Sequence, residues 1–513
     1  MGMPTGFRTR LLSILPRLID NHGVIDATNP ADLGVREAAT LLRSGDLSAV
    51  ELLDACEQRI AERNGGPPTF DGASGAVNAW ARLYPDLARQ QARAADERLR
   101  REGAEAPLLC GIPLALKDLY AVAGRPLTAS SRVLDGHVPD HDSTAWVRLR
   151  EAGMVLLGHT HTHEFAAGGT TDQVGNPHAL DRSAGGSSGG SSAALAAGMV
   201  PAALGTDTAG SLRIPAALAG VSSIKPTHGR VPLEGIIPLA PSLDHAGPMA
   251  RSLADCALLL EALAAGGAEV SPLLPPPAPL TGLTTPVPTT DRPLAGVRVA
   301  LTDRPDRVGV EPDIAEGLAR AAKACADLGA EVIELPAAAD MVGEDYSIVL
   351  FSEVAHYHRR FTGREADYRT SIREFVETSR LFTSLEAYLE AQREFAQLTA
   401  TWENWFAEHE IDVILEPSSP CTAPPRGGGY DSGRLGGEGD PLIRLTAIWN
   451  ATGFPVAAIP AEPGTRSGLP VGLSLIAPRG EEARVIRVGT ILQEYALHPP
   501  KPIAPRPRAQ AGE

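Results

Sequence analysis

The chain of 513 residues contains only five cysteines, and no two of them form a Cys-x-x-Cys pair. Close cysteine pairs are typical of zinc sites and of disulfide frameworks in small secreted domains. Their absence predicts a cytoplasmic protein without a metal site. The cysteines are spread along the chain, at Cys56, Cys110, Cys256, Cys325 and Cys421.

Basic residues are also in deficit, with 46 Lys and Arg against 62 Asp and Glu, which gives a net charge of −16. A surface this acidic repels phosphate backbones and anionic lipid headgroups. The composition therefore argues against nucleic acid and against a membrane surface as partners.

Long runs of large apolar residues are missing as well. Residues 183–206 carry no charge, but they consist mainly of Gly, Ser and Ala and are interrupted by Pro201. This composition predicts a tightly packed, buried segment instead of a membrane span. At the N-terminus, Ser13 and Pro16 interrupt the apolar stretch, which predicts a short amphipathic arm and not a signal peptide.

What is present is a pattern of helices alternating with short apolar strands. Helical spacing predicts helices over 33–64 and 84–102, with Ser48 and Glu51 as a capping box inside the first range. Residues 108–122 are expected to form a pair of buried strands. A helix over 144–152 and a strand over 155–158 follow, and this alternation is typical of an α/β fold.

A proline-rich segment over 266–295 predicts a linker loop between an N-terminal part, 33–265, and a C-terminal part, 296–500. Beyond it the pattern predicts a strand, a helix, a second strand and a mostly helical region, and then a mobile glycine-rich stretch. Their ranges are 297–301, 314–328, 332–335, 345–409 and 426–439.

Several motifs point to chemistry that their surroundings do not favour. Ser188 lies in a G-x-S-x-G pattern, but the polar residues before it do not form the strand that a nucleophile elbow needs. Ser222 and Lys225 match S-x-x-K in a strand-like run, whereas that motif belongs on a helix. His159, His161 and His163 would share one face of a strand, which fits a metal site or simply polar side chains turned toward solvent or a cleft.

Two other segments are more informative. Gly205–Ser211 follows an apolar strand and precedes a helix, so backbone N–H groups near Ser211 could form an oxyanion hole; a plain glycine-rich turn is the alternative. Lys117 lies inside an apolar strand, which is costly unless the amine is paired or neutral. The alternative for Lys117 is an edge strand from which the side chain reaches water.

Together these segments resemble the amidase signature family. The resemblance is close over 110–255, looser over 33–100 and 410–495, and it fades over 336–445. Ser187 and Ser211 are 24 positions apart, as are the two serines of that family. The matching motifs are Gly-Ile-Pro-x-x-x-Lys-Asp at 111–118, Gly-Gly-Ser-Ser-Gly-Gly-Ser at 185–191, Gly-Thr-Asp-Thr-x-Gly-Ser at 205–211 and Lys-Pro-Thr at 225–227.

The resemblance implies one α/β/α unit spanning 1–513, with a mixed, largely parallel central sheet and a variable helical cap from about 340–445. It implies Ser211 as nucleophile, Ser187 as proton relay after a cis Gly186–Ser187 bond, and Lys117 as general base. It also implies an oxyanion hole made by four backbone N–H groups, those of Thr208, Ala209, Gly210 and Ser211.

The activity implied by the resemblance is hydrolysis of carboxamides, and also of aryl esters or carbamates, without a metal or an organic cofactor. The expected partner is a small amide substrate, and a homodimer stays open. Two alternatives are the A subunit of a tRNA-dependent glutamine amidotransferase and a catalytically silent relative. Against the first, His245 follows Asp244 where such subunits usually have glutamine. Ala209 and Ser130 stand where many family members have glycine, and both affect the expected substrate shape more than the chemistry.

Overall fold

The computed structural model describes residues 29–264, 280, 283, 290–340, 343–427 and 440–497. The expected N-terminal arm and most of the proline-rich and glycine-rich segments lie outside this range. No helix in the described part of the chain is apolar over the length needed to cross a bilayer.

The core of the molecule is a single mixed sheet of 11 strands, with a separate two-stranded ribbon of β4 (Gly175–Asn176) and β5 (Ala179–Ser183). In spatial order the large sheet contains β1 (Trp80–Leu83), β3 (Val155–Thr160), β2 (Pro113–Lys117), β6 (Ala202–Asp207), β8 (His245–Ala250), β7 (Ser222–Lys225), β12 (Val456–Pro460), β13 (Gly472–Ile476), β11 (Val413–Pro417), β9 (Arg298–Thr302) and β10 (Glu331–Leu335).

The parallel strands fall into two groups. β3, β2 and β6 pair in parallel, and so do β11, β9 and β10. Between the groups, the pairings from β6 through β8, β7, β12 and β13 to β11 are antiparallel. The expected mixed α/β sheet is confirmed, with its parallel strands in two runs, because each part of the chain contains strands joined by a helical crossover.

Strands from both sides of the proline-rich segment join in this sheet, since β7 pairs with β12. Helices cover both faces. Gly472 packs against Ala217 of α7 (Arg213–Ala219), whereas Gly489 of α15 (Glu482–Tyr495) packs against Leu475, which points to the opposite face of β13. Helix α6 (Gly189–Ala196) adjoins α7, and α8 (Leu253–Ala264) adjoins α15.

Most predicted elements are confirmed. The first predicted helix is α2 (Val35–Ser44) and α3 (Ala49–Arg63), and Ser48 and Glu51 form the expected capping box. The predicted helices over 84–102, 144–152 and 314–328 are α4 (Pro85–Glu102), α5 (Thr144–Glu151) and α10 (Pro312–Asp327). The short helices α9 (Arg304–Val308) and α14 (Ile448–Ala451) were not predicted.

The pair of strands predicted over 108–122 is wrong, since one strand, β2, occupies this range. Gly111, with a φ of +86°, turns the chain before β2, and its N–H donates to the Gly153 carbonyl.

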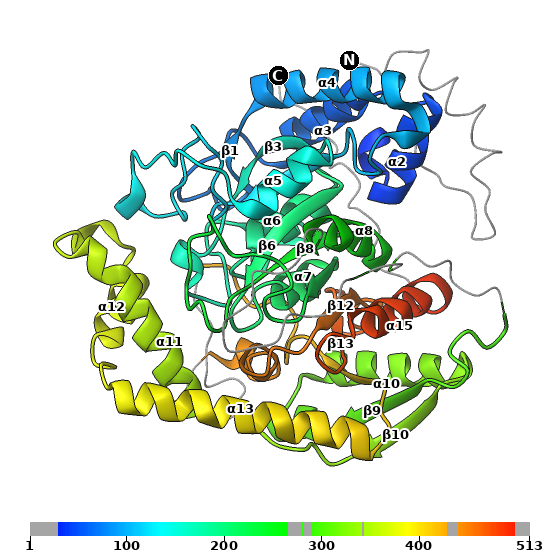
Figure 1. Cartoon of the computed structure of the whole chain (residues 1–513), viewed down its shortest axis with the longest axis vertical. Helices are drawn as coiled ribbons and strands as arrows, with labels where there is room; N and C mark the ends of the chain where they lie inside the picture. Colours follow the sequence, from blue (N-terminus) through cyan, green and yellow to red (C-terminus); the bar gives the residue numbers. More distant parts are fainter. Residues whose placement is uncertain are drawn as a thin grey trace, which may run out of the picture.

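The region predicted as helical over 345–409 forms α11 (Gly343–His358), α12 (Thr370–Ser379) and α13 (Leu385–Glu408). These helices form an outer cap that runs along the left and lower edges of the view in Figure 1. The C-terminal end of α13 packs through Trp402 and Trp405 against Trp449 and Phe454, beside the sheet.

Candidate active site

Lys117 is the last residue of β2 and its side chain is completely buried. Its Nζ donates to Ser187 Oγ at 2.7 Å and to Thr206 Oγ1 at 2.8 Å. Because β2 lies between β3 and β6, the alternative of an edge strand with a solvated lysine is wrong. Burial lowers the pKa of Lys117 to about 7, although Asp207 and Asp244 act in the opposite direction.

Ser187 lies in the turn that leads into α6, and the peptide bond between Gly186 and Ser187 is cis, as the resemblance implied. Its carbonyl oxygen accepts hydrogen bonds from the His163 N–H at 3.0 Å and from Thr171 Oγ1 at 3.2 Å. These two contacts hold the backbone of the turn from which the Ser187 hydroxyl reaches Lys117.

Ser211 lies in the short connection between β6 and α7. The Ser188 N–H donates to the Ser211 carbonyl at 3.3 Å, which brings the two serine-containing segments side by side. Ser211 retains 7% exposure, whereas Ser187 and Lys117 have none. Of the three residues expected to act together, Ser211 is therefore the one that a substrate can reach.

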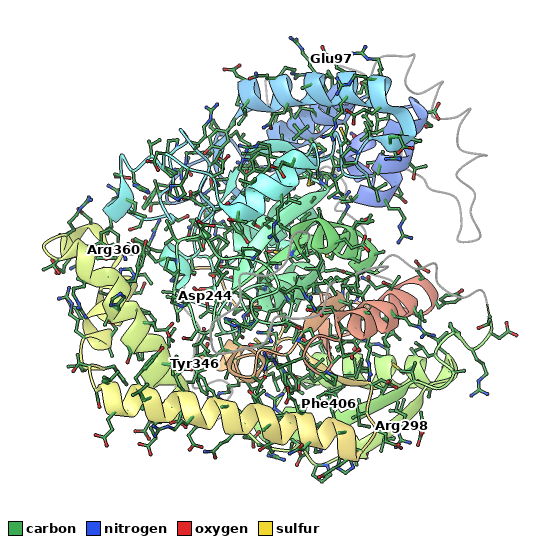
Figure 2. All side chains as sticks on the ribbon, viewed as in Figure 1. Glu97, Asp244, Arg298, Tyr346, Arg360 and Phe406 are labelled. Carbon is green, nitrogen blue, oxygen red and sulfur yellow. The ribbon has the colours of Figure 1, made fainter. Side chains whose placement is uncertain are left out.

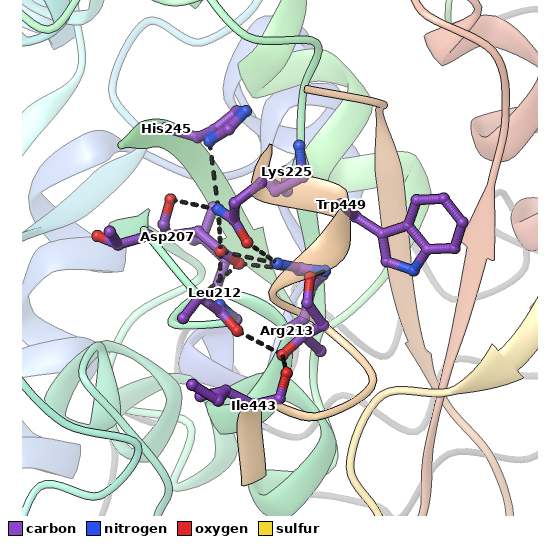
Figure 3. A network of polar contacts seen from close by, with 12 residues as sticks. Asp207, Leu212, Arg213, Lys225, His245, Ile443 and Trp449 are labelled. Atoms are coloured by element: carbon purple, nitrogen blue, oxygen red, sulfur yellow. Dashed lines mark hydrogen bonds and ion pairs between the residues drawn. The ribbon is translucent and has the colours of Figure 1, made fainter. Parts of the chain in front are cut away.

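The carboxylate of Asp207 holds the connection around Ser211 in shape. It accepts hydrogen bonds from the N–H groups of Gly210 at 2.8 Å and Leu212 at 3.0 Å. It also forms a bidentate ion pair with Arg213, in which both N···O distances are 2.9 Å (Figure 3). Both side chains are fully buried. Arg213 outweighs the effect of burial and holds the pKa of Asp207 well below its usual range.

One expectation about the oxyanion hole is corrected by this geometry. Gly210 N–H is committed to Asp207 and does not face the site as a free donor. Within the described residues, the N–H groups of Thr208, Ala209 and Ser211 have no acceptor. The candidate oxyanion hole is thereby reduced to these three donors.

A cavity of about 240 Å³ lies directly beside Thr206, the second partner of Lys117. Its walls are mainly apolar and include Ala166. The other described lining residues are Leu119, Leu233, Ile236, Ile237, Pro238, Leu239, Pro241 and Asp244. Asp244 is fully engaged, since it accepts from Thr208 Oγ1 and from the N–H groups of Leu239 and Ala240.

Comparison with known proteins shows the family to which the chain belongs. A family model described as Amidase matches residues 70–486. The chain belongs to the amidase family. It is 35% identical to the A subunit of the glutamyl-tRNA(Gln) amidotransferase of Chloroflexus aurantiacus, over 90% of this chain and 96% of that protein.

Solved structures of other amidases share the fold. The native peptide amidase of Stenotrophomonas maltophilia is 28% identical, with a TM-score of 0.75 over 92% of this chain and 99% of that one. The A subunit of the glutamyl-tRNA(Gln) amidotransferase of Thermotoga maritima is 26% identical, with a TM-score of 0.72 over 94% of this chain and 99% of that one. The family thus includes proteins named as peptide amidases and proteins named as amidotransferase subunits.

The competing motifs have structural positions in this member of the amidase family. Ser188 Oγ donates to the Thr206 carbonyl at 3.1 Å, and Ser222 and Lys225 lie on a strand, β7. His159 Nδ1 is 2.7 Å from Tyr84 Oη, and His161 Nε2 is 3.0 Å from the Thr69 carbonyl. Within the described residues there is no group of His, Cys, Asp or Glu that could hold a metal ion.

The two departures from the family pattern also have an explanation. Ser130 adopts a left-handed φ of +51°, which explains why glycine is common at this position. Its N–H donates at 3.0 Å to Asp118, whose carboxylate also pairs with Arg82 and fixes the turn. The Ala209 methyl group packs on an apolar cluster that includes Tyr346 and Leu243.

Three further residues at the site come from the C-terminal part, and the sequence pattern did not assign a role to them. Asn450 Nδ2 donates to the carbonyl and to a carboxylate oxygen of Asp207, each at 2.9 Å. Thr446 and Tyr346 donate to carbonyl groups of the loop before Ser211. Asn450 and Thr446 both lie in 410–495, where the resemblance to the family is looser, whereas Tyr346 lies in 336–445, where it fades.

Proposed function

We propose that this amidase hydrolyses carboxamides through an acyl-enzyme formed on Ser211. The observation that carries the proposal is the 2.7 Å hydrogen bond between Lys117 Nζ and Ser187 Oγ, made by a lysine with a pKa of about 7. A serine hydroxyl is a weak nucleophile until a base takes its proton. A buried lysine that is about half neutral at pH 7 and mostly neutral at pH 8 can be that base.

In the proposed reaction, neutral Lys117 takes a proton from Ser187 while Ser187 takes the proton of Ser211 Oγ, which comes within hydrogen-bond distance of Ser187 Oγ when the substrate binds. The Ser211 oxygen then forms a bond to the amide carbon, and the negative charge on the carbonyl oxygen is held by N–H groups of Thr208, Ala209 and Ser211. Return of the proton through Ser187 releases the amine as the C–N bond breaks. Water then attacks the ester by the same route and restores Ser211.

The cavity beside Thr206 supports an uncharged substrate. Apolar side chains and prolines form most of its wall, and its carboxylate, Asp244, already accepts three hydrogen bonds. A free amino acid such as glutamine brings an ammonium and a carboxylate group, and each is costly to transfer into such surroundings without a partner. We therefore expect aliphatic or aryl amides to be better substrates than glutamine.

A second candidate function is that of an amidotransferase A subunit, and the comparisons favour it. The curated relative from Chloroflexus aurantiacus carries that name and is matched along almost its whole length. The acidic net charge weighs less against nucleic-acid partners for the same reason, since that relative is named for a tRNA. In that case glutamine would be the amide, and full activity would depend on partner subunits.

The deciding experiment uses the purified chain alone and its Ser211→Ala variant. Each is assayed with an aliphatic amide, an aryl anilide, glutamine and an aryl carbamate, and each is treated with a serine-reactive phosphonate. Hydrolysis of the uncharged amides that disappears in Ser211→Ala supports the first candidate. Phosphonate labelling of Ser211 with activity on glutamine alone, or with none, supports the second, and activity that survives in Ser211→Ala contradicts both.

A further inference from the structure

We propose that Tyr346, on the cap helix α11, is a positioning residue that sets the orientation of the oxyanion-binding N–H groups. This inference rests on the proposed acyl transfer at Ser211. It assigns to the cap a part in stabilising the transition state, exerted through the orientation of the Ala209 N–H.

The Tyr346 hydroxyl donates to the Thr208 carbonyl oxygen at 2.6 Å. The side chain is 3% exposed and packs in an apolar cluster with Val349, Leu243 and Phe395. Burial raises the pKa of Tyr346 well above its ordinary value, so the hydroxyl keeps its proton at every pH at which an amidase would be assayed. Figure 2 shows Tyr346 near the start of α11, on the side of the cap that faces the core, below Asp244.

The consequence follows from the geometry of a peptide unit. In a trans peptide the C=O and the N–H point in opposite directions. When Tyr346 holds the Thr208 carbonyl toward α11, the Ala209 N–H of the same peptide is turned away from α11. That N–H is one of those without an acceptor in the described part of the chain.

The next two peptides of the loop are held in the same manner. Thr446 Oγ1 donates to the Ala209 carbonyl, and the Gly210 N–H of that peptide points the other way, to Asp207 at 2.8 Å. The Ile214 N–H donates to the Gly210 carbonyl at 2.7 Å, which turns the Ser211 N–H away from α7. Each of these three carbonyl oxygens therefore accepts a hydrogen bond, which fixes the direction of the N–H group in the same peptide.

Among these donors, Tyr346 is the one supplied by the cap. Gly210, with a φ of +137°, gives the loop conformational freedom that other residues lack. Without the tyrosine hydroxyl, the Thr208–Ala209 peptide can rotate and present its carbonyl dipole to the developing oxyanion. That orientation repels the negative charge which the N–H is meant to stabilise.

The test is Tyr346→Phe, which removes one oxygen atom and keeps the ring in its cluster. Loss of a single oxyanion donor typically lowers kcat by about 100- to 1,000-fold, so loss of a residue that only orients the donor should lower it by roughly 10- to 100-fold. KM should change by less than about threefold, because Tyr346 does not line the cavity beside Thr206. Affinity for an aldehyde transition-state analogue should fall in parallel with kcat/KM.

The matched control is Tyr368→Phe. Tyr368 is a buried tyrosine of the same cap, and its hydroxyl lies 2.7 Å from His358 Nδ1, outside the candidate site. The Tyr368→Phe variant should have the same kcat and the same affinity for the aldehyde as the wild type. If Tyr346→Phe does not accumulate as folded protein, 3-fluorotyrosine at position 346 keeps the contact while changing its donor strength, and kcat should shift at constant KM.

The outcomes separate the inference from the function on which it rests. A wild-type chain that neither hydrolyses amides nor reacts with the phosphonate contradicts the proposed function. An active wild type whose kcat and aldehyde affinity are unchanged in Tyr346→Phe overturns the role of Tyr346 and leaves the proposed function standing. An equal loss in Tyr368→Phe also overturns it, since the effect would then be a general one of the cap.

Discussion

Lys117 and Ser187 are 70 positions apart in the chain, and a hydrogen bond of 2.7 Å joins their side chains in a fully buried pocket. The contact forms because the turn before α6 lies at the C-terminal end of β2, where Lys117 is the last residue of the strand. Both side chains lack exposure, so the ionisation of Lys117 depends on the protein interior. The burial of Lys117 therefore determines the pH at which the proposed chemistry can operate.

The activity should depend on pH through Lys117. Its pKa is lowered to about 7, so the amine is protonated and inactive as a base below that value and neutral above it. We expect kcat/KM for an uncharged amide to rise through about pH 7 and then to level off. Lys117→Arg should be inactive, because a guanidinium stays protonated. Lys323→Arg, at an exposed ion pair, is the control; a flat profile from pH 5 to 9 would contradict the assignment.

Stability should also depend on pH at Lys117, and the sign follows from linkage. Between about pH 7 and its ordinary pKa of 10.5, Lys117 is charged in the unfolded chain and neutral in the folded one. Unfolding therefore takes up a proton in this range, and the contribution of Lys117 to stability improves as the pH rises. Lys117→Met should be more stable than the wild type at pH 7 in urea denaturation, with an advantage that shrinks toward pH 10.

Ser211→Ala should abolish activity without harming the fold. The Ser211 hydroxyl has no hydrogen-bond partner among the described residues, so its loss removes the nucleophile and little else. We expect kcat to fall by a factor on the order of 10³ or more, with the thermal midpoint within a few degrees of the wild type. Residual turnover above one hundredth of the wild-type rate would show that another group is the nucleophile, and Ser188 would be examined next.

The ion pair between Arg213 and Asp207 should be essential for stability. Both side chains are fully buried, so Arg213→Met leaves an unpaired carboxylate in the interior. Breaking such a pair costs about 3–5 kcal/mol of unfolding free energy. The exposed pair of Lys323 and Asp327 is the control, and Lys323→Met should cost less than about 1 kcal/mol. Urea denaturation of both variants measures the loss of unfolding free energy. Equal losses in the two variants would contradict an essential role of the buried ion pair.

The cavity beside Thr206 should set the size of the acyl group. Ile236 lines this cavity of about 240 Å³, and Ile236→Trp should fill part of it. We expect KM for a bulky acyl amide to rise at least about tenfold, which corresponds to about 1.4 kcal/mol, while that for acetamide stays nearly constant. Leu385→Trp, at an exposed position on α13, is the control. An unchanged preference between the two substrates would show that the acyl group binds elsewhere.

Much of the local structure could be predicted from the sequence because it depends on short-range patterns. The capping box of Ser48 and Glu51 and the helices α4 and α10 were recognisable from spacing alone. The second strand over 108–122 was predicted wrongly because an apolar run does not distinguish a strand from a buried turn, and Gly111 makes that turn.

Ordered motifs at fixed spacing were enough to identify the family and the candidate residues Lys117, Ser187 and Ser211, because motif order and spacing are properties of the sequence. The packed fold was needed to show that Gly210 N–H is taken by Asp207, and that Tyr346 and Thr446 hold the loop before Ser211. These contacts join side chains to backbone groups through single hydrogen bonds, and those of Tyr346 and Thr446 connect residues far apart in the chain. No local pattern encodes such a bond, because its geometry exists only after the sheet and the cap have packed together.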